Sequence, residues 1–233
     1  PVVLFAGLLW SFGPLVVRYM DQPELIPWQY VFGRGLTIFI IINIYLFLDE
    51  GLEFIENYKN IGLSGIFGGI GLGIAMITFI WSITHTTAAV TLLCLATMPF
   101  ITALMAYFFL KETISLNVWI SIGLATLGII IMALGNTSKG SLLGFIFGIL
   151  SSIGFSVFSV SLRWRKSTPK FTTVAVSGLF CVFASSIIIL MTDSQFLSSS
   201  HNQGMFGIHG TLVCMGLILY SIGSKAIPAA ELT

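Results

Sequence analysis

Residues 61–84 read IGLSGIFGGIGLGIAMITFIWSIT, a stretch without a single charged side chain. A helix needs about 20 mostly apolar residues to cross the hydrocarbon core of a bilayer, and this stretch meets that length. Seven other apolar stretches accompany it. We therefore predict an all-α membrane protein with eight spans, near residues 2–20, 27–48, 61–84, 88–110, 114–135, 141–163, 172–192 and 205–223.

The composition supports a lipid-embedded chain. Of the 233 residues, 56% are hydrophobic and 8% are charged, whereas about a quarter of the residues in a soluble domain are charged. The net charge of +1 argues against nucleic acid, which needs a basic face. Cys94, Cys181 and Cys214 lie in apolar stretches without metal or disulfide spacing, so we expect no metal and no cofactor.

Positive charge falls mainly in every second gap between the predicted spans. Seven of the ten basic residues lie in these gaps: Lys59, Lys111, Arg163, Arg165, Lys166, Lys170 and Lys225. Because Lys and Arg favour cytoplasmic loops, these gaps and the N-terminus are predicted to be cytoplasmic. We expect a multi-pass protein of the cell inner (plasma) membrane.

Two pairs of short segments suggest an internal repeat. Residues 7–13 (GLLWSFG) resemble residues 148–154 (GILSSIG), and residues 81–83 resemble residues 220–222 at nearly the same spacing. Five spans separate the copies, and an odd number inverts the second copy in the membrane, a plan that recurs in secondary transporters.

The repeat predicts two inverted five-helix units. The first covers residues 1–136 and the second covers residues 141–233. The second unit is incomplete: residues 226–233 read as the start of a ninth helix. Since a half-helix would leave unpaired carbonyls in lipid, and since the chain lacks a starting Met, we expect a fragment of a longer protein.

Arg34 lies inside the second predicted span, roughly 10 Å deep at 1.5 Å per residue. A charge at that depth usually faces the bundle interior or a water-filled cavity. Arg34 is therefore a candidate to line a cavity and attract an anionic or carbonyl group. The alternatives are that it reaches back to the nearer membrane surface or bonds helix carbonyls.

Trp10 and Ser11 lie in the first span beside Gly13 and Pro14. Proline bends a helix and frees a carbonyl, and broken helices near the midplane often mark binding sites. We interpret Trp10 and Ser11 as cavity residues, with plain helix packing as the alternative. Their repeat counterpart Ser152, and Ser156 one turn further, share this interpretation.

Four more residues are candidates for the cavity. Trp81 and His85 lie near the outer end of the third span: Trp81 could equally be an interfacial anchor, and His85 could couple protons or be a solvated loop residue. Thr97 and Pro99 in the fourth span either expose backbone groups or shape a kink. Glycines spaced by four in residues 65–73 indicate close helix packing.

Several motifs together resemble the EamA-type drug/metabolite transporter superfamily. They are LWSFG at residues 9–13, Arg34, THTTAA at 84–89, MPFITAL at 98–104, FLKE at 109–112 and IPAAEL at 227–232. The resemblance implies ten helices in two inverted repeats around a central cavity. It also implies export or exchange of small metabolites, including amino acids and nucleotide sugars.

We therefore expect a secondary transporter that works by alternating access on a small-molecule substrate within the lipid bilayer. No nucleotide-binding loop is recognisable, and a homodimer is left open. An integral membrane enzyme would need carboxylates, a His/Asp group or a metal cluster at membrane depth. The spans lack such acids, and we place none of the three histidines in the middle of a span. A non-transporting membrane scaffold and a channel are two further hypotheses.

The topology has a direct test. A Lys166→Cys variant is expected to resist an impermeant thiol reagent added outside intact cells, because the gap at 163–170 is predicted to be cytoplasmic. A Lys139→Cys variant, in a gap predicted to be external, is the matched control and should react. Labelling of the first variant and protection of the second would reverse the orientation.

Overall fold

The computed structural model describes residues 2–135, 142–165 and 167–223. Within these residues the regular structure is helical, and no strand occurs. Several predictions concern residues outside this part of the chain: the ninth helix at 226–233 and the basic residues Lys139, Lys166 and Lys225.

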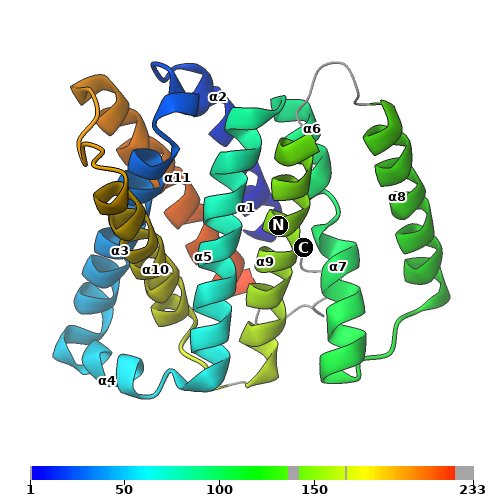
Figure 1. The fold of residues 1–233 in the computed structure, drawn as a ribbon. Helices are drawn as coiled ribbons and strands as arrows, with labels where there is room; N and C mark the ends of the chain where they lie inside the picture. Colours follow the sequence, from blue (N-terminus) through cyan, green and yellow to red (C-terminus); the bar gives the residue numbers. More distant parts are fainter. Residues whose placement is uncertain (1, 136–141, 166, 224–233) are drawn as a thin grey trace.

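The helices form a bundle whose long members run side by side (Figure 1). The helices are α1 (Val2–Ser11), α2 (Gly13–Arg18), α3 (Pro27–Glu50), α4 (Phe54–Lys59), α5 (Gly62–His85), α6 (Ala88–Leu95), α7 (Met98–Met105), α8 (Leu116–Gly135), α9 (Leu142–Trp164), α10 (Lys170–Met191) and α11 (Ser200–Gly223). Short turns of 3-10 or π type cover Pro23–Leu25, Gly51–Glu53 and Ala106–Leu110.

Six stretches of the described residues are helical, long and apolar enough to cross a membrane. They are Pro27–Lys59, Gly62–His85, Ala88–Leu110, Leu142–Trp164, Lys170–Met191 and Ser200–Gly223. Each overlaps a predicted span. The other two predicted spans, 2–20 and 114–135, hold the shorter apolar helices Leu4–Arg18 and Leu116–Gly128. The chain is thus a multi-pass membrane protein, while the count of eight spans stays a prediction.

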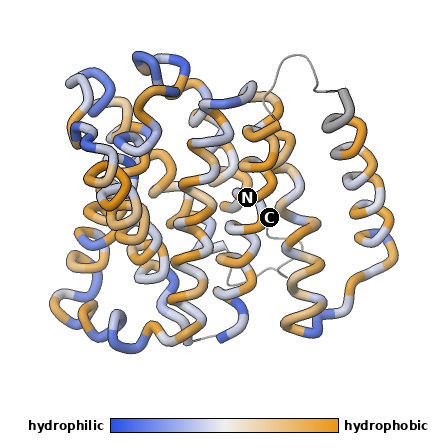
Figure 2. Tube along the Cα trace, in the orientation of Figure 1, coloured by the Kyte–Doolittle hydropathy of each residue, from blue (hydrophilic) through white to orange (hydrophobic). Residues whose placement is uncertain are grey.

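The distribution of polarity fits a lipid environment. Hydrophilic residues gather toward the two ends of the bundle, and hydrophobic residues dominate between them (Figure 2). Large apolar side chains such as Phe67, Phe183 and Leu190 are exposed on its outer surface. Contiguous exposed apolar surface on this scale marks contact with lipid or another apolar partner.

Glycine pairs let neighbouring helices approach until their backbones touch. A Cβ atom at Gly154 of α9 would lie 2.6 Å from the carbonyl oxygen of Gly71 in α5. A Cβ atom at Gly178 of α10 would lie 2.8 Å from the carbonyl oxygen of Gly35 in α3. A side chain cannot fit against a backbone atom at these distances, so glycine sets the spacing of both helix pairs.

Two of the apolar stretches are broken. The stretch Leu4–Arg18 is interrupted at Phe12, between α1 and α2, and Pro14 is the second residue of α2. The stretch Ala88–Leu110 is interrupted between α6 and α7, and Pro99 is the second residue of α7. Proline has no N–H to donate, so the carbonyls of Trp10 and Leu95 lack the usual partner four residues on.

The contact between α5 and α9 gives a stability prediction. Gly154→Val is expected to destabilise the folded protein by about 1–3 kcal/mol, because its side chain would overpack against the backbone of α5. Thermal unfolding in detergent, followed by size-exclusion chromatography, would measure this.

Gly207→Val in α11 is the matched control, because a Cβ there meets nothing within 4 Å. Equal melting temperatures for the two variants would contradict the assignment of Gly154 as a spacing residue.

Candidate functional site

A cavity of about 190 Å³ lies between helices of the bundle, and both the N-terminal and the C-terminal half of the sequence contribute to it. Its lining comes from α1, α3, α5, α6, α7, α9 and α11. The residues are Gly7, Trp10, Ser11, Arg34, Leu72, Ala75, Met76, Phe79, Leu92, Leu95, Met98, Ser151, Phe155, His209, Val213 and Leu217. The lining is mostly apolar, with a small number of polar groups, which is typical of small-molecule sites.

Arg34 supplies the cationic side chain of this lining. It belongs to α3, is 3% exposed, and its Nη2 donates a hydrogen bond of 2.8 Å to the carbonyl oxygen of Met76 in α5. The guanidinium carbon lies 5.6 Å from the ring centroid of Phe79 and 5.9 Å from that of Tyr30, within range of a cation–π attraction. Arg34 therefore does not reach back to the membrane surface.

Arg34 bonds a helix carbonyl and also lines the cavity, while its attraction of a solute group stays a prediction. A guanidinium carries five N–H donors. Within the described residues, one hydrogen bond from its side chain is present, and no carboxylate lies within ion-pair distance of it. Arg34 therefore keeps donor capacity at the cavity.

His209 lies beside Arg34 and is a residue that the sequence patterns did not single out. Its Nδ1 forms a hydrogen bond with the hydroxyl of Tyr30, and the Tyr30 ring stacks on Phe206 with centroids 5.2 Å apart. The prediction that none of the three histidines lies in the middle of a span was wrong for His209, because α11 begins at Ser200 and not at residue 205. His209 is thus the tenth residue of a 24-residue helix.

A signal for the earlier start of α11 exists in the sequence. The hydroxyl oxygen of Ser199 accepts a hydrogen bond of 3.2 Å from the backbone N–H of Asn202. A serine just before a helix that accepts from the third helical N–H is a typical N-cap. The polar run at residues 198–202 resembles a gap between two spans, although its serines favour a helix start.

The break after α1 makes room for His209. A Cβ atom at Gly13 would lie 2.9 Å from His209 Nε2, so the glycine at the break lets the imidazole approach the first helix. The break and the histidine therefore form one structural unit at the edge of the cavity.

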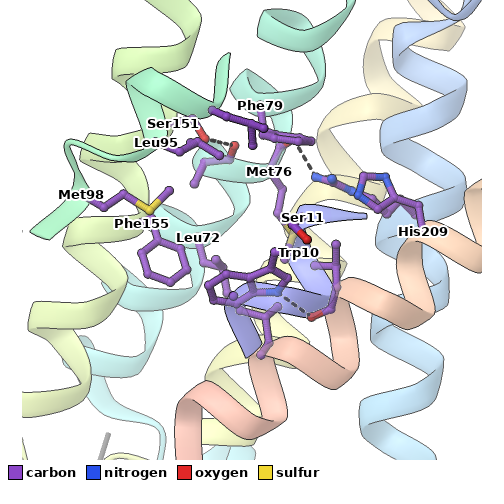
Figure 3. Close-up of a pocket in the computed structure, with 16 residues that line it drawn as sticks. Trp10, Ser11, Leu72, Met76, Phe79, Leu95, Met98, Ser151, Phe155 and His209 are labelled. Atoms are coloured by element: carbon purple, nitrogen blue, oxygen red, sulfur yellow. Dashed lines mark hydrogen bonds between the residues drawn. The ribbon is translucent and has the colours of Figure 1, made fainter. Parts of the chain in front are cut away.

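Trp10 forms much of the apolar wall. Its ring centroid lies 5.4 Å from that of Phe155 and 5.8 Å from that of Tyr220, and its Nε1 donates to the carbonyl oxygen of Val213 at 3.4 Å. The neighbouring Ser11 donates to the carbonyl oxygen of Leu8 at 2.7 Å. Figure 3 shows Trp10 and Ser11 between His209 on one side and Phe155 and Met98 on the other.

Four other predicted residues form a second group outside the lining. Thr97 and Pro99 lie at the break between α6 and α7, where Thr97 Oγ1 donates to the carbonyl oxygen of Cys94 at 2.7 Å. Ser152 Oγ of α9 donates to the same carbonyl oxygen at 2.7 Å. Ser156 Oγ accepts from Thr102 at 3.0 Å. The hydrogen bonds of Ser152 and Ser156 join α9 to the broken helix.

Trp81 and His85 form a third group, at the end of α5. Their rings stack with centroids 4.9 Å apart, and Trp81 also meets Trp28 at 5.5 Å. His85 Nδ1 lies 2.9 Å from the carbonyl oxygen of Trp81. The structure thus brings Trp10, Ser11 and Arg34 together at the cavity and places the other six predicted residues elsewhere; a role for any of the nine in substrate binding stays a prediction.

Metal-binding residues do not converge in the described part of the chain: no group of three His, Cys, Asp or Glu side chains there could hold an ion. The expectation that no metal is bound remains an expectation.

Known proteins resemble the chain along most of its length. The chain is 24% identical over 217 residues to an uncharacterized transporter of Helicobacter pylori strain J99, covering 88% of this chain and 70% of that protein. The corresponding protein of strain 26695 is 23% identical over the same coverage. A protein with a solved crystal structure shares the fold with a TM-score of 0.65 and 18% identity, over 99% of this chain and 80% of that one.

A family match agrees with the resemblance drawn from the motifs. The EamA-like transporter family matches residues 1–134, which is more than half of the chain. Together with apolar helices long enough to cross a membrane, this match confirms the superfamily suggested by the sequence: the chain belongs to the EamA-like transporter family.

Proposed function

We propose that the protein is a secondary transporter that moves small metabolites through this cavity by alternating access. The observation that carries the proposal is the cavity itself, an apolar chamber at membrane depth with a buried guanidinium in its wall. A charge held inside a membrane bundle is costly and is usually retained for a functional reason.

The packing of the helices supports two inverted repeats. In that arrangement α1, α3 and α5 correspond to α9, α10 and α11. The contact of α5 with α9 then has a counterpart in the contact of α11 with α1, and the contact of α5 with α10 has a counterpart in that of α11 with α3. Helices α3 and α10, which correspond to each other, pack together. Each of these pairs maps onto another observed pair or onto itself, as a two-fold relation requires.

The broken helices support a substrate path at the same place. The carbonyls that Pro14 and Pro99 leave without their usual partners belong to Trp10 and Leu95, and both residues line the cavity. Irregular backbone at membrane depth is tolerated where it is buried in protein or lines a cavity, and transporter sites are often built from such helices.

Orientation and direction complete the proposal. The basic gaps favour an N-terminus in the cytoplasm of a cell whose inner (plasma) membrane holds the protein. Export or exchange, driven by an ion or substrate gradient, is the direction that the family resemblance favours. Rocking of one repeat against the other would open the cavity first to one side and then to the other.

The test of this function is flux in reconstituted liposomes. The full-length protein is expected to give saturable uptake of at least one labelled metabolite, stimulated when the unlabelled compound is loaded inside. Unsaturable flux would favour a channel, and absence of flux with every compound would favour a scaffold or an enzyme.

Arg34→Ala is expected to lower that flux by at least about tenfold, because a hydrogen bond to a charged group contributes about 1.5–3 kcal/mol. The comparison is made at equal amounts of folded protein. Arg18→Ala is the matched control, since Arg18 is an exposed arginine at the end of α2. Unchanged flux in the Arg34 variant would remove Arg34 from the transport path.

A further inference from the structure

We propose that the cavity selects small organic anions with an apolar body and no ammonium group, with Arg34 as the counter-ion of the bound solute. This inference rests on the proposed function, and it narrows the class of solute that the cavity takes.

The charged side chain in the described lining of the cavity is positive. Among the described residues that line it, Arg34 is a cation and none is acidic. The Asp and Glu residues that the structure describes are exposed, except for half-buried Glu112, which pairs with Arg163 at 2.8 Å. An anionic solute therefore meets an opposite charge in this lining, whereas an ammonium group meets no carboxylate there.

The state of Arg34 favours an anionic occupant. Its side chain is 3% exposed, and removal of a charge from water is costly unless it is paired and hydrogen-bonded. The carbonyl oxygen of Met76 satisfies one donor, and the rings of Tyr30 and Phe79 add weaker attraction. A carboxylate can accept two parallel hydrogen bonds from a guanidinium, which would supply the opposite charge that the described surroundings lack.

The neighbours of Arg34 add polarity without adding negative charge. His209 lines the same cavity, and Tyr30 holds its ring through Nδ1. The Nε2 atom points toward Gly13 at the helix break. The end of the cavity at Arg34 thus holds a guanidinium and an imidazole, and the other polar side chains of the lining include the neutral hydroxyls of Ser11 and Ser151.

The opposite end of the cavity suits an apolar body. In Figure 3, His209 lies on one side of the view, and Leu95, Met98 and Phe155 lie on the other, with Trp10 between them. The volume of about 190 Å³ is below the ~300–1,000 Å³ of sites for drug-sized ligands. A solute with one ring or a short aliphatic chain attached to one acidic group matches this division.

Binding of three compounds of similar shape tests the inference. Isothermal titration of the detergent-solubilised full-length protein would compare 3-phenylpropionate, its uncharged amide 3-phenylpropionamide, and the zwitterion phenylalanine. We expect the dissociation constant of 3-phenylpropionate to be at least about tenfold below those of the other two. This comparison needs no variant, so it does not depend on whether a mutant folds.

Variants locate the preference. Arg34→Gln is expected to remove the advantage of the anion over the amide, and Arg34→Lys is expected to keep part of it, because lysine retains the charge but not the two-pronged geometry. Arg18→Gln, a change in an exposed arginine, should leave all three constants unchanged. Size-exclusion profiles and melting temperatures confirm that each variant is folded before titration.

The outcomes separate this inference from the transport function. Phenylalanine binding as tightly as 3-phenylpropionate, together with saturable counterflow of phenylalanine, would overturn the anion preference and leave transport intact; the carbonyls at the helix breaks would then take the ammonium group. Equal binding of the amide would also overturn it.

If none of the three compounds binds, the flux assay in liposomes tests the anion preference instead. Counterflow confined to anionic metabolites would support the inference, and counterflow of zwitterions or cations would overturn it. Absence of binding together with absence of any flux would remove both the inference and the proposed function.

Discussion

The burial of one guanidinium inside an apolar helix bundle is the constraint on which the rest of the structure depends. Arg34 is almost fully removed from solvent, in a part of the chain that must also exclude lipid. Its surroundings reduce the cost in three ways: a carbonyl of α5 accepts one hydrogen bond, two aromatic faces lie nearby, and a cavity leaves room for a further partner. Helices α3 and α5 are held at the distance that makes this arrangement possible.

Glycines set the spacing of each of these two helices from another neighbour. The backbones of α5 and α9 touch at Gly71 and Gly154, and those of α3 and α10 touch at Gly35 and Gly178. Tight contact on these sides coexists with an opening where α1 and the α6–α7 segment are broken by proline. The cavity is therefore the place where close packing stops, and the residues around it are mostly the large apolar ones that close packing would exclude.

The sequence predicted the class of the fold and part of the site. Depth within a span was enough to select Arg34, and proximity to Pro14 was enough to select Trp10 and Ser11, because both arguments depend on local sequence. The hydroxyl of Ser152 had the same apparent merit, yet it donates to the carbonyl of Cys94 in α6. Which carbonyl a serine meets depends on the neighbouring helix, and no pattern within one span contains that information.

The sequence patterns did not select His209, because the predicted start of its helix was misplaced. A start of α11 five residues too late moved the imidazole from the middle of a span to its edge, although Ser199 carried the capping signal. Helix ends are decided by single side-chain hydrogen bonds, which apolar periodicity does not report. In a membrane protein such an error changes the apparent depth of a polar side chain and hence the role assigned to it.

Two contacts between an aromatic ring and a glycine join α1 and α2 to α11, the last described helix. The ring of Trp10 occupies the space over Gly216, where a Cβ atom would collide with its Nε1, and His209 occupies the space over Gly13. One ring, Trp10, comes from α1 and packs against a glycine of α11, and the other, His209, comes from α11 and packs against a glycine of α2. Sliding of either helix along its axis would drive an aromatic ring against a neighbouring side chain or backbone, so these two contacts oppose axial sliding between α1–α2 and α11.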